Sequence, residues 1–504
     1  MSDSSPYDPP NSAPPNTAAS PTGDAVPISE KIGYGLGDTA SNFYWKLFEN
    51  FQLYFYTEIF GITAIAAGWM FLITKIWDAF NDPMIGFLAD RTRTAWGRFR
   101  PYLIWMSIPF ALTGMLAFYT PDLPPTQKLI YAYVTYTLVF MAYTAINIPY
   151  GALMGVLSSN SEERTNISTY RFVLAFFGGL IVQFFTLPLT SYFGGGMVEV
   201  VKDGVTTKVV ADPQTGFFWT VVCYAIAAMI LFTITFLTTK ERVQPEQEKN
   251  TALSQDVKDL AKNWPWIVLL FVGLFQILAG WTRGSATAYY FEYFVDVDII
   301  PSVLFIDLSS FGNFFFLGGI ASILGMVVLT KPLVKIFGNK WLMIFVMVAN
   351  AACMAAFYFL TKDQWQLMYG LHLFGAFISG PMPILLWAMY ADVADYSEWL
   401  NHRRATGLVF AAATFAQKVG SALGAAVPGW ALGYSGFVEP VENIKQAQSE
   451  ETISGIISMM SVLPAIFLLF GCVVMLFYNL TSKRLKQIES DLLKRKSETA
   501  ALND

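Results

Sequence analysis

The chain has 504 residues, of which 54% are hydrophobic and only 14% are charged. A soluble domain carries about 25% charged residues and stops enlarging a single core at roughly 250 to 300 residues, so this composition excludes one large water-soluble domain. The net charge of −5 argues against a nucleic-acid-binding protein, which needs a concentrated basic face. The three cysteines, Cys223, Cys353 and Cys472, lie in apolar runs and are interpreted as small buried residues without a disulfide framework.

The N-terminal segment, residues 1–30, differs from the rest of the chain in composition. It is rich in Pro, Ser, Asn, Ala and Thr, which is typical of a disordered tail because so few apolar side chains cannot offset the entropy lost on ordering. A secretory signal begins with basic residues before an apolar stretch of about 7 to 15 residues, whereas the first lysine here is Lys31. We therefore expect the N-terminus to stay in the cytoplasm.

Beyond Lys31, apolar segments long enough to cross a bilayer recur between short polar breaks. A helix of about 20 apolar residues spans the roughly 30 Å of hydrocarbon, so each such segment predicts a transmembrane helix. The sequence thus predicts an all-α membrane protein with twelve transmembrane helices. They cover residues 33–60, 64–90, 101–119, 129–157, 168–194, 217–239, 264–294, 307–331, 340–361, 366–395, 405–435 and 454–480.

The domain organisation follows from the widest polar stretch, residues 240–263, which predicts a cytoplasmic linker between two six-helix bundles, 31–239 and 264–480. Residues 481–504 are expected to form a second cytoplasmic tail. Cytoplasmic flanks retain positive charge. Most of the 32 Lys and Arg residues lie on the predicted cytoplasmic flanks, and the opposite flanks carry only Lys128, Lys202, Lys208, Lys362 and Lys445. This asymmetry predicts that both termini are inside.

A small group of basic residues falls within the predicted helices, near the middle of the membrane. A charge near the bilayer centre costs at least about 2.5 to 3.5 kcal/mol, so each needs a partner or a function. These residues are Lys46, Lys75, Arg283 and Lys418. Spacings of three and four residues place Lys75, Asp78 and Asp82 on one face of the second predicted helix.

Two interpretations of these charges remain open. In the first, they form structural pairs, Lys75 with Asp78 and Lys46 with Glu49. In the second, Asp78 and Asp82 form a site, because two ionised carboxylates one turn apart repel and favour a bound cation or a shared proton. Oxygen ligands without a His or Cys cluster favour Na⁺, Li⁺ or H⁺ over a transition metal.

A specific motif in the second predicted helix reads IWDAFNDPMIGFLADRT over residues 76–92 and is followed by GRFRPY over residues 97–102. In these residues the chain resembles the glycoside-pentoside-hexuronide:cation symporters. Further motifs that support the resemblance follow one another along the chain. They are KIGYGLG at 31–37, NIPY at 147–150, RGS at 283–285, ADVADYSEW at 391–399, RRATG at 403–407 and FAQK at 415–418.

The resemblance implies the major facilitator fold, in which two six-helix bundles enclose a central cavity and rock against each other. It implies that Asp78 and Asp82 bind the cation, that Thr414 and Lys418 lie near the cation and sugar sites, and that Arg171 lies near the sugar. It also implies a multi-pass protein of a bacterial inner membrane with no cofactor besides its coupling ion, Na⁺ or H⁺.

The predicted sugar site departs from that of the melibiose permease, a member of this family. Asn42 and Asn147 stand where that permease has aspartates, and Gly151 stands where it has a tryptophan, so a glycoside other than melibiose is expected. Aromatic rings serve as stacking platforms in sugar sites. The candidate rings are those of Tyr34, Tyr44, Trp45, Tyr150 and Trp387. The complete predicted substrate set is Asn42, Lys46, Asn147, Tyr150, Arg171, Arg283, Trp387 and Lys418.

The charge of the sugar is left open by the sequence. One hypothesis is that Lys46 and Arg283 bind a carboxylate or sulfonate on an anionic sugar, because a cation in a low-dielectric cavity favours such a group. The alternative is that Glu49 pairs with Lys46, while Arg283 pairs with Glu292 or with backbone carbonyls. That arrangement would leave a neutral pocket suited to pentosides or glucosides.

Charged residues near the cytoplasmic ends of the predicted helices are candidates for a gate. One group comprises Asp90, Arg91, Arg98 and Arg100, and the other comprises Asp392, Asp395, Glu398, Arg403 and Arg404. Opposite charges in the two groups could latch the bundles in the outward-facing state. Exposed pairs contribute only about 0 to 1 kcal/mol each, so a latch requires a network. The alternative is that these are ordinary surface charges.

Together these features predict a secondary transporter that imports a pentoside, hexoside or hexuronide with Na⁺ or H⁺ as a functional monomer. The chain has only two histidines, His372 and His402, and no nucleophile elbow or phosphate loop, which disfavours a membrane enzyme. A proton-coupled exporter of small amphipathic compounds shares the predicted fold and is the main alternative. A sensor that binds its ligand without transport is a third.

Overall fold

The computed structural model describes residues 26–158, 160–202, 205–243, 262–303, 306–401, 406–440, 446–481, 484–488, 490–492 and 494–495. Several sequence predictions fall on the remaining residues. The predicted N-terminal tail up to residue 25, most of the predicted linker (244–261), and part of the predicted C-terminal tail lie outside the described residues. The gating candidates Arg403 and Arg404 also lie outside them.

The described chain folds almost entirely into helices. In hydrocarbon every backbone N–H and C=O needs an internal partner, and a helix supplies one for nearly all of them. The first half contains α1 (Ile28–Tyr54), η1 (Phe55–Phe60), α2 (Ala64–Arg91), α3 (Arg100–Trp105), α4 (Ser107–Ala117), α5 (Pro125–Leu157), α6 (Ser161–Phe193) and α7 (Pro213–Thr238). The second half contains α9 (Trp264–Tyr293), η2 (Val297–Ile299), α10 (Phe311–Ala356), η3 (Phe357–Phe359), α11 (Trp365–Ser379), α12 (Met382–Asn401), α13 (Thr406–Tyr434), α14 (Glu450–Met460) and α15 (Val462–Leu476).

Two short antiparallel hairpins lie in the connections between helices. Strand β1 (Met197–Lys202) pairs with β2 (Val205–Val210), and β3 (Ser302–Val303) pairs with β4 (Ile306–Asp307). Gly195 and Gly196, both with positive φ, turn the chain from α6 into β1, a backbone conformation that glycine adopts without steric cost. The pattern of long apolar segments does not predict these strands, because the strands are shorter than such segments and lie between them.

Some predicted segments are joined into one observed helix, and others are divided between two helices. Helix α10 runs through both predicted segments 307–331 and 340–361, with one non-helical residue, Gly338, at φ 70°. Conversely, the helix pairs α3 with α4, α11 with α12, and α14 with α15 each cover one predicted segment. Pro381 lies at the break between α11 and α12, where its missing N–H cannot continue the helix.

Among the described residues, seven helical segments are long and apolar enough to cross a membrane. They are Pro125–Leu157, Glu163–Phe193, Pro213–Thr238, Trp264–Tyr293, Phe311–Phe359, Trp365–Leu400 and Glu450–Leu476. Helices α1 and α2 are of similar length, but charged side chains interrupt their apolar residues. The protein is therefore a multi-pass membrane protein, whereas the crossing of the membrane by twelve helices stays a prediction.

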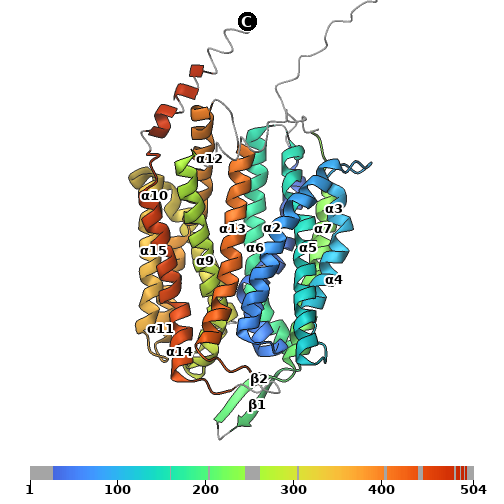
Figure 1. The fold of residues 1–504 in the computed structure, drawn as a ribbon, viewed down its shortest axis with the longest axis vertical. Helices are drawn as coiled ribbons and strands as arrows, with labels where there is room; N and C mark the ends of the chain where they lie inside the picture. Colours follow the sequence, from blue (N-terminus) through green and yellow to red (C-terminus); the bar gives the residue numbers. More distant parts are fainter. Residues whose placement is uncertain are drawn as a thin grey trace, which may run out of the picture.

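The two halves of the chain lie side by side, with first-half helices in blue to green and second-half helices in yellow to red (Figure 1). Helix pairs that connect the halves include α1 with α9, α2 with α13, and α6 with α10. Glycines allow α2 and α13 to approach closely, since a Cβ on Gly429 would lie 2.6 Å from the carbonyl oxygen of Ala64. Small residues allow the same close approach between helices in many membrane proteins.

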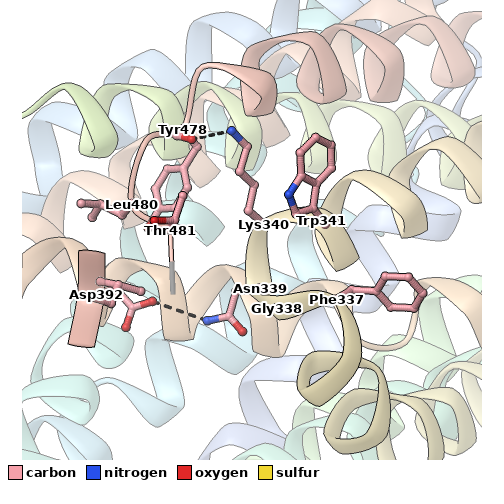
Figure 2. A pocket seen from close by; sticks show the side chains of 10 residues that line it. Phe337, Gly338, Asn339, Lys340, Trp341, Asp392, Tyr478, Leu480 and Thr481 are labelled. Carbon is pink, nitrogen blue, oxygen red and sulfur yellow. Dashed lines mark hydrogen bonds between the residues drawn. The ribbon is translucent and has the colours of Figure 1, made fainter. Parts of the chain in front are cut away.

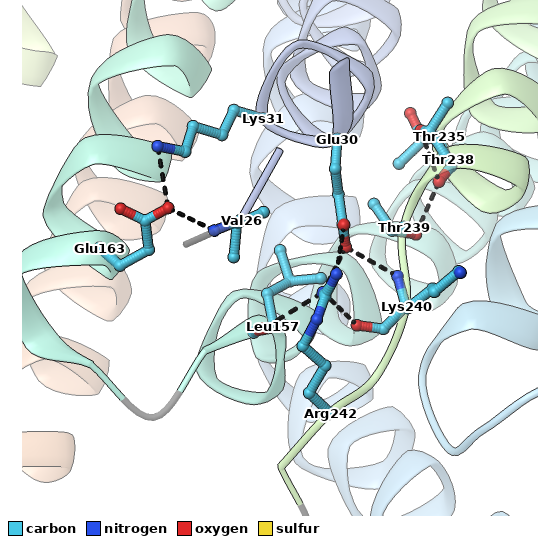
Figure 3. Close-up of polar contacts among 10 residues, drawn as sticks. All are labelled: Val26, Glu30, Lys31, Leu157, Glu163, Thr235, Thr238, Thr239, Lys240 and Arg242. Atoms are coloured by element: carbon cyan, nitrogen blue, oxygen red, sulfur yellow. Dashed lines mark hydrogen bonds and ion pairs between the residues drawn. The ribbon is translucent and has the colours of Figure 1, made fainter. Parts of the chain in front are cut away.

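Ion pairs and hydrogen bonds fasten the start of α1 to neighbouring helices (Figure 3). The Arg242 guanidinium donates to both carboxylate oxygens of Glu30 at 2.7 Å, and the backbone N–H of Lys240 donates to the same carboxylate at 2.9 Å. Lys31 pairs with Glu163 near the start of α6 at 2.9 Å. These contacts join α1, α6 and the segment after α7 within the first half.

Candidate functional site

The predicted cation site is a cluster that joins the two halves of the protein. Asp78 and Asp82 lie one turn apart on α2, and both carboxylates face Lys418 on α13. The Nζ of Lys418 lies 3.0 Å from Oδ2 of Asp78 and also donates to Oδ2 of Asp82. The structure thus brings together three residues that the sequence assigned to the cation and sugar sites.

Thr144 also belongs to the cluster and was missed by the sequence analysis. The hydroxyl of Thr144 on α5 donates to Oδ1 of Asp78 at 2.6 Å. Within the described part of the chain, Asp82 Oδ1 and Asn81 Nδ2 are buried and have no hydrogen-bond partner. Carboxylate, hydroxyl and amide oxygens are the ligands that hard cations prefer. Thr414, the other predicted cation residue, lies one turn before Lys418 and is exposed.

The described contacts include no ion pair between Lys75 and Asp78, which differs from the structural interpretation of that pair. The Lys75 side chain is buried, and its Nζ lies 3.6 Å from the centroid of the Phe140 ring. The rings of Trp45 and Trp281 each lie 5.4 Å from the same Nζ. Aromatic faces stabilise a cation electrostatically, so three rings take the place that a carboxylate was expected to fill.

A second polar cluster lies on α1 and contains several predicted substrate residues. Arg171 on α6 pairs with Asp38, its Nε lying 2.8 Å from Oδ2, and its guanidinium lies over the ring of Tyr150. Asp38 was missed by the sequence analysis, although it precedes Asn42 by one turn on the same helical face. The amide of Asn42 donates to the Asp38 carbonyl at 2.9 Å.

Helix α5 contributes Asn147, Tyr150 and Gly151 to this region. The hydroxyl of Ser41 donates to Oδ1 of Asn147 at 2.8 Å, so this face of α5 points towards α1. Tyr150 stacks on Tyr34 with ring centroids 4.7 Å apart, and each hydroxyl donates to the other residue's carbonyl. A Cβ placed on Gly151 would meet no atom within 4 Å, so open space adjoins α5 one turn beyond Asn147.

The remaining predicted substrate cations have partners of their own. Lys46 pairs with Glu49 at 2.6 Å, which bears out the structural interpretation of this pair. Arg283 donates to the carbonyl of Met460 at 3.1 Å and lies over the ring of Phe357. Because Trp281 on the same helix faces Trp45 of the first half, a rotation of roughly 200° over two residues directs Arg283 into the second half.

The structure places the Arg283 side chain apart from the predicted substrate residues of α1 and α5, and its role in substrate binding stays a prediction. Its two described contacts, with the Met460 carbonyl and the Phe357 ring, both lie in the second half, where one of the sequence alternatives placed its partner. Among the candidate rings, Trp45 packs edge-on against Trp281, Tyr44 is fully buried against Phe110, and Trp387 lies near Tyr390. Trp45 therefore contacts a residue of the other half, whereas Tyr44 and Trp387 contact residues of their own half.

The predicted gating charges of the first half make contacts within that half. The backbone N–H groups of Arg98 and Arg100 donate to the carboxylate of Glu241 at 2.8 and 2.9 Å. Arg100 also donates to the carbonyl of Phe236 at 2.7 Å, and the Arg91 guanidinium lies over the Phe87 ring. In the second half, Asp392 accepts a hydrogen bond from Asn339 at 3.5 Å. The described contacts of these residues thus include no bond between the two groups.

Bonds between the halves occur instead at the end of α1. The hydroxyls of Thr57 and Tyr289 lie 2.5 Å apart, and the Tyr293 hydroxyl donates to the Glu58 carboxylate at 2.9 Å. The backbone N–H of Ala64 donates to Glu439 at 3.0 Å. This end of the fold carries the β1–β2 hairpin and lies opposite the red helical segment 484–488 (Figure 1). The two halves are therefore closed against each other at that end.

A separate cavity of about 260 Å³ lies in the second half, beside the break in α10 at Gly338 (Figure 2). Its lining includes Asn339, Asp392 and the start of the α10 segment that follows the break. Lys340 donates to the carbonyls of Leu476 and Tyr478 at its edge. Of the predicted site residues, this cavity contains only the gating candidate Asp392.

Comparisons with known proteins agree with this architecture. The profile of the MFS/sugar transport protein family matches residues 33–482. The chain is 34% identical to the inner membrane symporter YicJ of Escherichia coli, covering 94% of this chain and 96% of that one. It is 32% identical to the isoprimeverose transporter of Lactiplantibacillus pentosus, covering 95% and 94%. The inward open xylose transporter XylE of E. coli has the same fold, with a TM-score of 0.56 at 13% identity over 92% and 98%.

Proposed function

Because the chain belongs to the MFS/sugar transport protein family, we propose that it imports a glycoside by symport with Na⁺ or H⁺. Family membership makes the protein a membrane transporter and not an enzyme, and it confirms the resemblance carried by the motifs. The symporter and isoprimeverose transporter among its relatives support the choice of a glycoside and a coupled cation. In this proposal the substrate is a pentoside, hexoside or hexuronide.

The observation that carries the proposal is the contact of Lys418 with Asp78 and Asp82 across the two halves. A lysine ammonium and a bound cation would compete for the same carboxylates. When the cation binds, Lys418 loses its partners and the bond between α2 and α13 is released. Cation binding is thereby linked to movement of the halves, which is the requirement for coupled transport.

The transport cycle that we propose is alternating access between two six-helix bundles, 31–239 and 264–480. In the state described here the halves are bonded through Thr57, Glu58 and Ala64, which the predicted orientation places on the outer side. This corresponds to a protein closed to the outside. Twelve membrane crossings with both termini in the cytoplasm complete the proposal, in which the predicted gating charges pair only in the opposite state.

The proposal is tested by counterflow in proteoliposomes that contain the purified full-length protein. A panel of labelled pentosides, hexosides and hexuronides is supplied while the Na⁺ and H⁺ gradients are varied independently. We expect at least one glycoside to exchange faster than in protein-free vesicles, and to accumulate only with an inward gradient of one cation. No exchange of any member would contradict sugar transport, and accumulation without a cation gradient would contradict symport.

A further inference from the structure

The described cations between the two halves are already compensated by this chain's own groups. Lys418 faces Asp78 and Asp82, and Lys46 faces Glu49. The remaining two are Lys75, which is enclosed by aromatic rings, and Arg171, which pairs with Asp38. The partners of these four cations therefore help to decide whether an anionic sugar can bind in this region.

Asp38 and Arg171 are the pair best placed to meet a substrate. Their side chains are 12% and 26% exposed, so each keeps part of its surface accessible. The described bond uses Nε of Arg171 and Oδ2 of Asp38, which leaves both terminal nitrogens of the guanidinium and Oδ1 of the carboxylate outside it. The pair lies beside Tyr150 and Asn42, and open space adjoins Gly151, the residue after Tyr150.

The pair disfavours an anionic ligand for an electrostatic reason. In a low-dielectric site, a carboxylate or sulfonate of the substrate would have to displace Asp38 from Arg171 or lie beside its negative charge. A neutral sugar avoids this cost. Its hydroxyl groups can donate to Asp38 Oδ1 and accept from the guanidinium, so both charged partners gain hydrogen bonds while their own bond persists.

Lys46 does not restore a site for an anion. Its Nζ lies 2.6 Å from Glu49, and its side chain packs against α6 beside Gly179. Arg283 is directed into the second half, as its contacts with Met460 and Phe357 show. The two cations that suggested an anionic sugar are therefore paired in one case and remote from the α1 cluster in the other.

We propose that Asp38 is a specificity-determining residue, which neutralises Arg171 and thereby selects neutral glycosides over hexuronides and sulfonated sugars. This inference rests on the proposed sugar transport and names its substrate class. Neither the motifs quoted above nor the predicted substrate set includes Asp38, whose role is inferred from its contact with Arg171.

The test uses two probes that differ only at C6, 4-nitrophenyl β-glucoside and 4-nitrophenyl β-glucuronide, with 4-nitrophenyl β-xyloside as the pentoside. Each competes for counterflow of the labelled sugar in proteoliposomes. In the wild type we expect the glucoside to compete at a concentration at least about tenfold lower than the glucuronide. In Asp38→Asn the freed Arg171 should reduce this ratio by about tenfold.

A double variant and a control separate the role of Asp38 from a general effect on folding. Asp38→Asn combined with Arg171→Gln removes both charges and should restore the preference for the glucoside. Glu30→Gln breaks the ion pair with Arg242, which is also partly buried but lies at the start of α1 (Figure 3), about two helical turns before Asp38, and should leave the ratio unchanged. If Asp38→Asn does not fold, Arg171→Gln alone must still retain the neutral preference.

The outcomes distinguish this inference from the proposed function. A wild-type preference for the glucuronide, or a ratio that is the same in the wild type and Asp38→Asn, would overturn the role of Asp38 while leaving sugar transport intact. Failure of every glycoside to exchange would overturn the proposed function and, with it, this inference.

Discussion

At the residue scale, the interior of the protein is governed by how its charges are compensated. Lys418 contacts two carboxylates, those of Asp78 and Asp82, so its single charge cannot neutralise both of them. Asp82 Oδ1 has no partner among the described residues. A buried carboxylate oxygen without a partner costs about 1 to 3 kcal/mol, which a bound cation would recover. We therefore expect a cation to replace Lys418 at the two carboxylates.

The first prediction concerns these carboxylates. Asp78→Asn or Asp82→Asn should reduce sugar accumulation about 5- to 150-fold, the range that corresponds to loss of a typical coupling free energy. Downhill exchange should persist, because the predicted sugar residues Asn42, Asn147 and Arg171 lie on α1, α5 and α6, away from the two carboxylates. Uptake and counterflow in the same vesicles measure the two effects. Asp122→Asn, an exposed carboxylate between α4 and α5, serves as control, and full accumulation in both site variants would refute the assignment.

The second prediction concerns Lys418. If its ammonium competes with the cation, Lys418→Gln should lower the cation concentration that half-saturates uptake by about fivefold or more. Titration of initial uptake rates with Na⁺ at fixed pH, and with pH at fixed Na⁺, measures this concentration. The exposed Lys362→Gln is the control. An unchanged half-saturating concentration in Lys418→Gln, at normal expression, would leave Lys418 only a structural role.

At the element scale, α5 and the contact between α2 and α13 connect the two clusters. One face of α5 carries Phe140 beside Lys75, Thr144 on Asp78, and Asn147 on Ser41. A rotation of α5 would therefore disturb the cation cluster and the α1 cluster together. The α2–α13 contact depends on glycines, because a side chain at Gly429 would collide with the α2 backbone.

The third prediction tests this helix contact. Gly429→Ala should force α2 and α13 apart and favour the state in which the Thr57 end opens, since the added Cβ would lie 2.6 Å from the Ala64 carbonyl oxygen. A cysteine at Thr57, in a background without Cys223, Cys353 and Cys472, reports opening by its labelling rate. We expect an increase of about tenfold, which corresponds to a population shift of about 1.4 kcal/mol.

A glycine with free space around it provides the control for that variant. A Cβ on Gly370 in α11 would meet no atom within 4 Å. Gly370→Ala should therefore leave the labelling rate unchanged and stabilise its helix by roughly 0.5 to 1 kcal/mol. Equal labelling rates in the two glycine variants would show that the close contact at Gly429 does not hold the described state.

At the scale of the whole molecule, the sequence predicted the family and the position of most helices, because these depend on apolar length and on local motifs. It also placed Asp78, Asp82 and Lys418 near one another, through a resemblance that covers both halves. The partner of Lys75 could not be predicted, since the rings of Trp45, Phe140 and Trp281 come from three helices far apart in sequence. Helix spacing alone suggested Asp78, the nearest opposite charge along the chain.

Asp38 and Arg283 also differ from the sequence prediction, because their contacts come from residues far away in sequence. Asp38 sits on the predicted polar face of α1, but its importance depends on Arg171, which is 133 residues away in sequence. Arg283 appeared suitable for a substrate because of its depth, whereas its side of α9 is decided by the packing of Trp281 on Trp45. Depth in the membrane can be read from sequence position, but the direction in which a helix faces requires knowledge of its neighbours.

The last prediction concerns the bond between the halves at the end of α1. The Tyr293 hydroxyl donates to Glu58 at 2.9 Å, and a hydrogen bond to a charged group contributes about 1.5 to 3 kcal/mol. Tyr293→Phe removes this bond between the halves and should shift the protein towards the state that is open at this end. Labelling of a cysteine at Thr57 should accelerate by about tenfold or more.

The matched control is Tyr131→Phe, which removes a tyrosine hydroxyl that donates to the Leu116 carbonyl within the first half. It should not change the labelling rate, because no bond between the halves is lost. Glucoside counterflow provides a second readout, since a transporter that is biased towards one state exchanges substrate more slowly at saturating sugar. If Tyr293→Phe and Tyr131→Phe label at the same rate, the Tyr293–Glu58 bond does not contribute to closure.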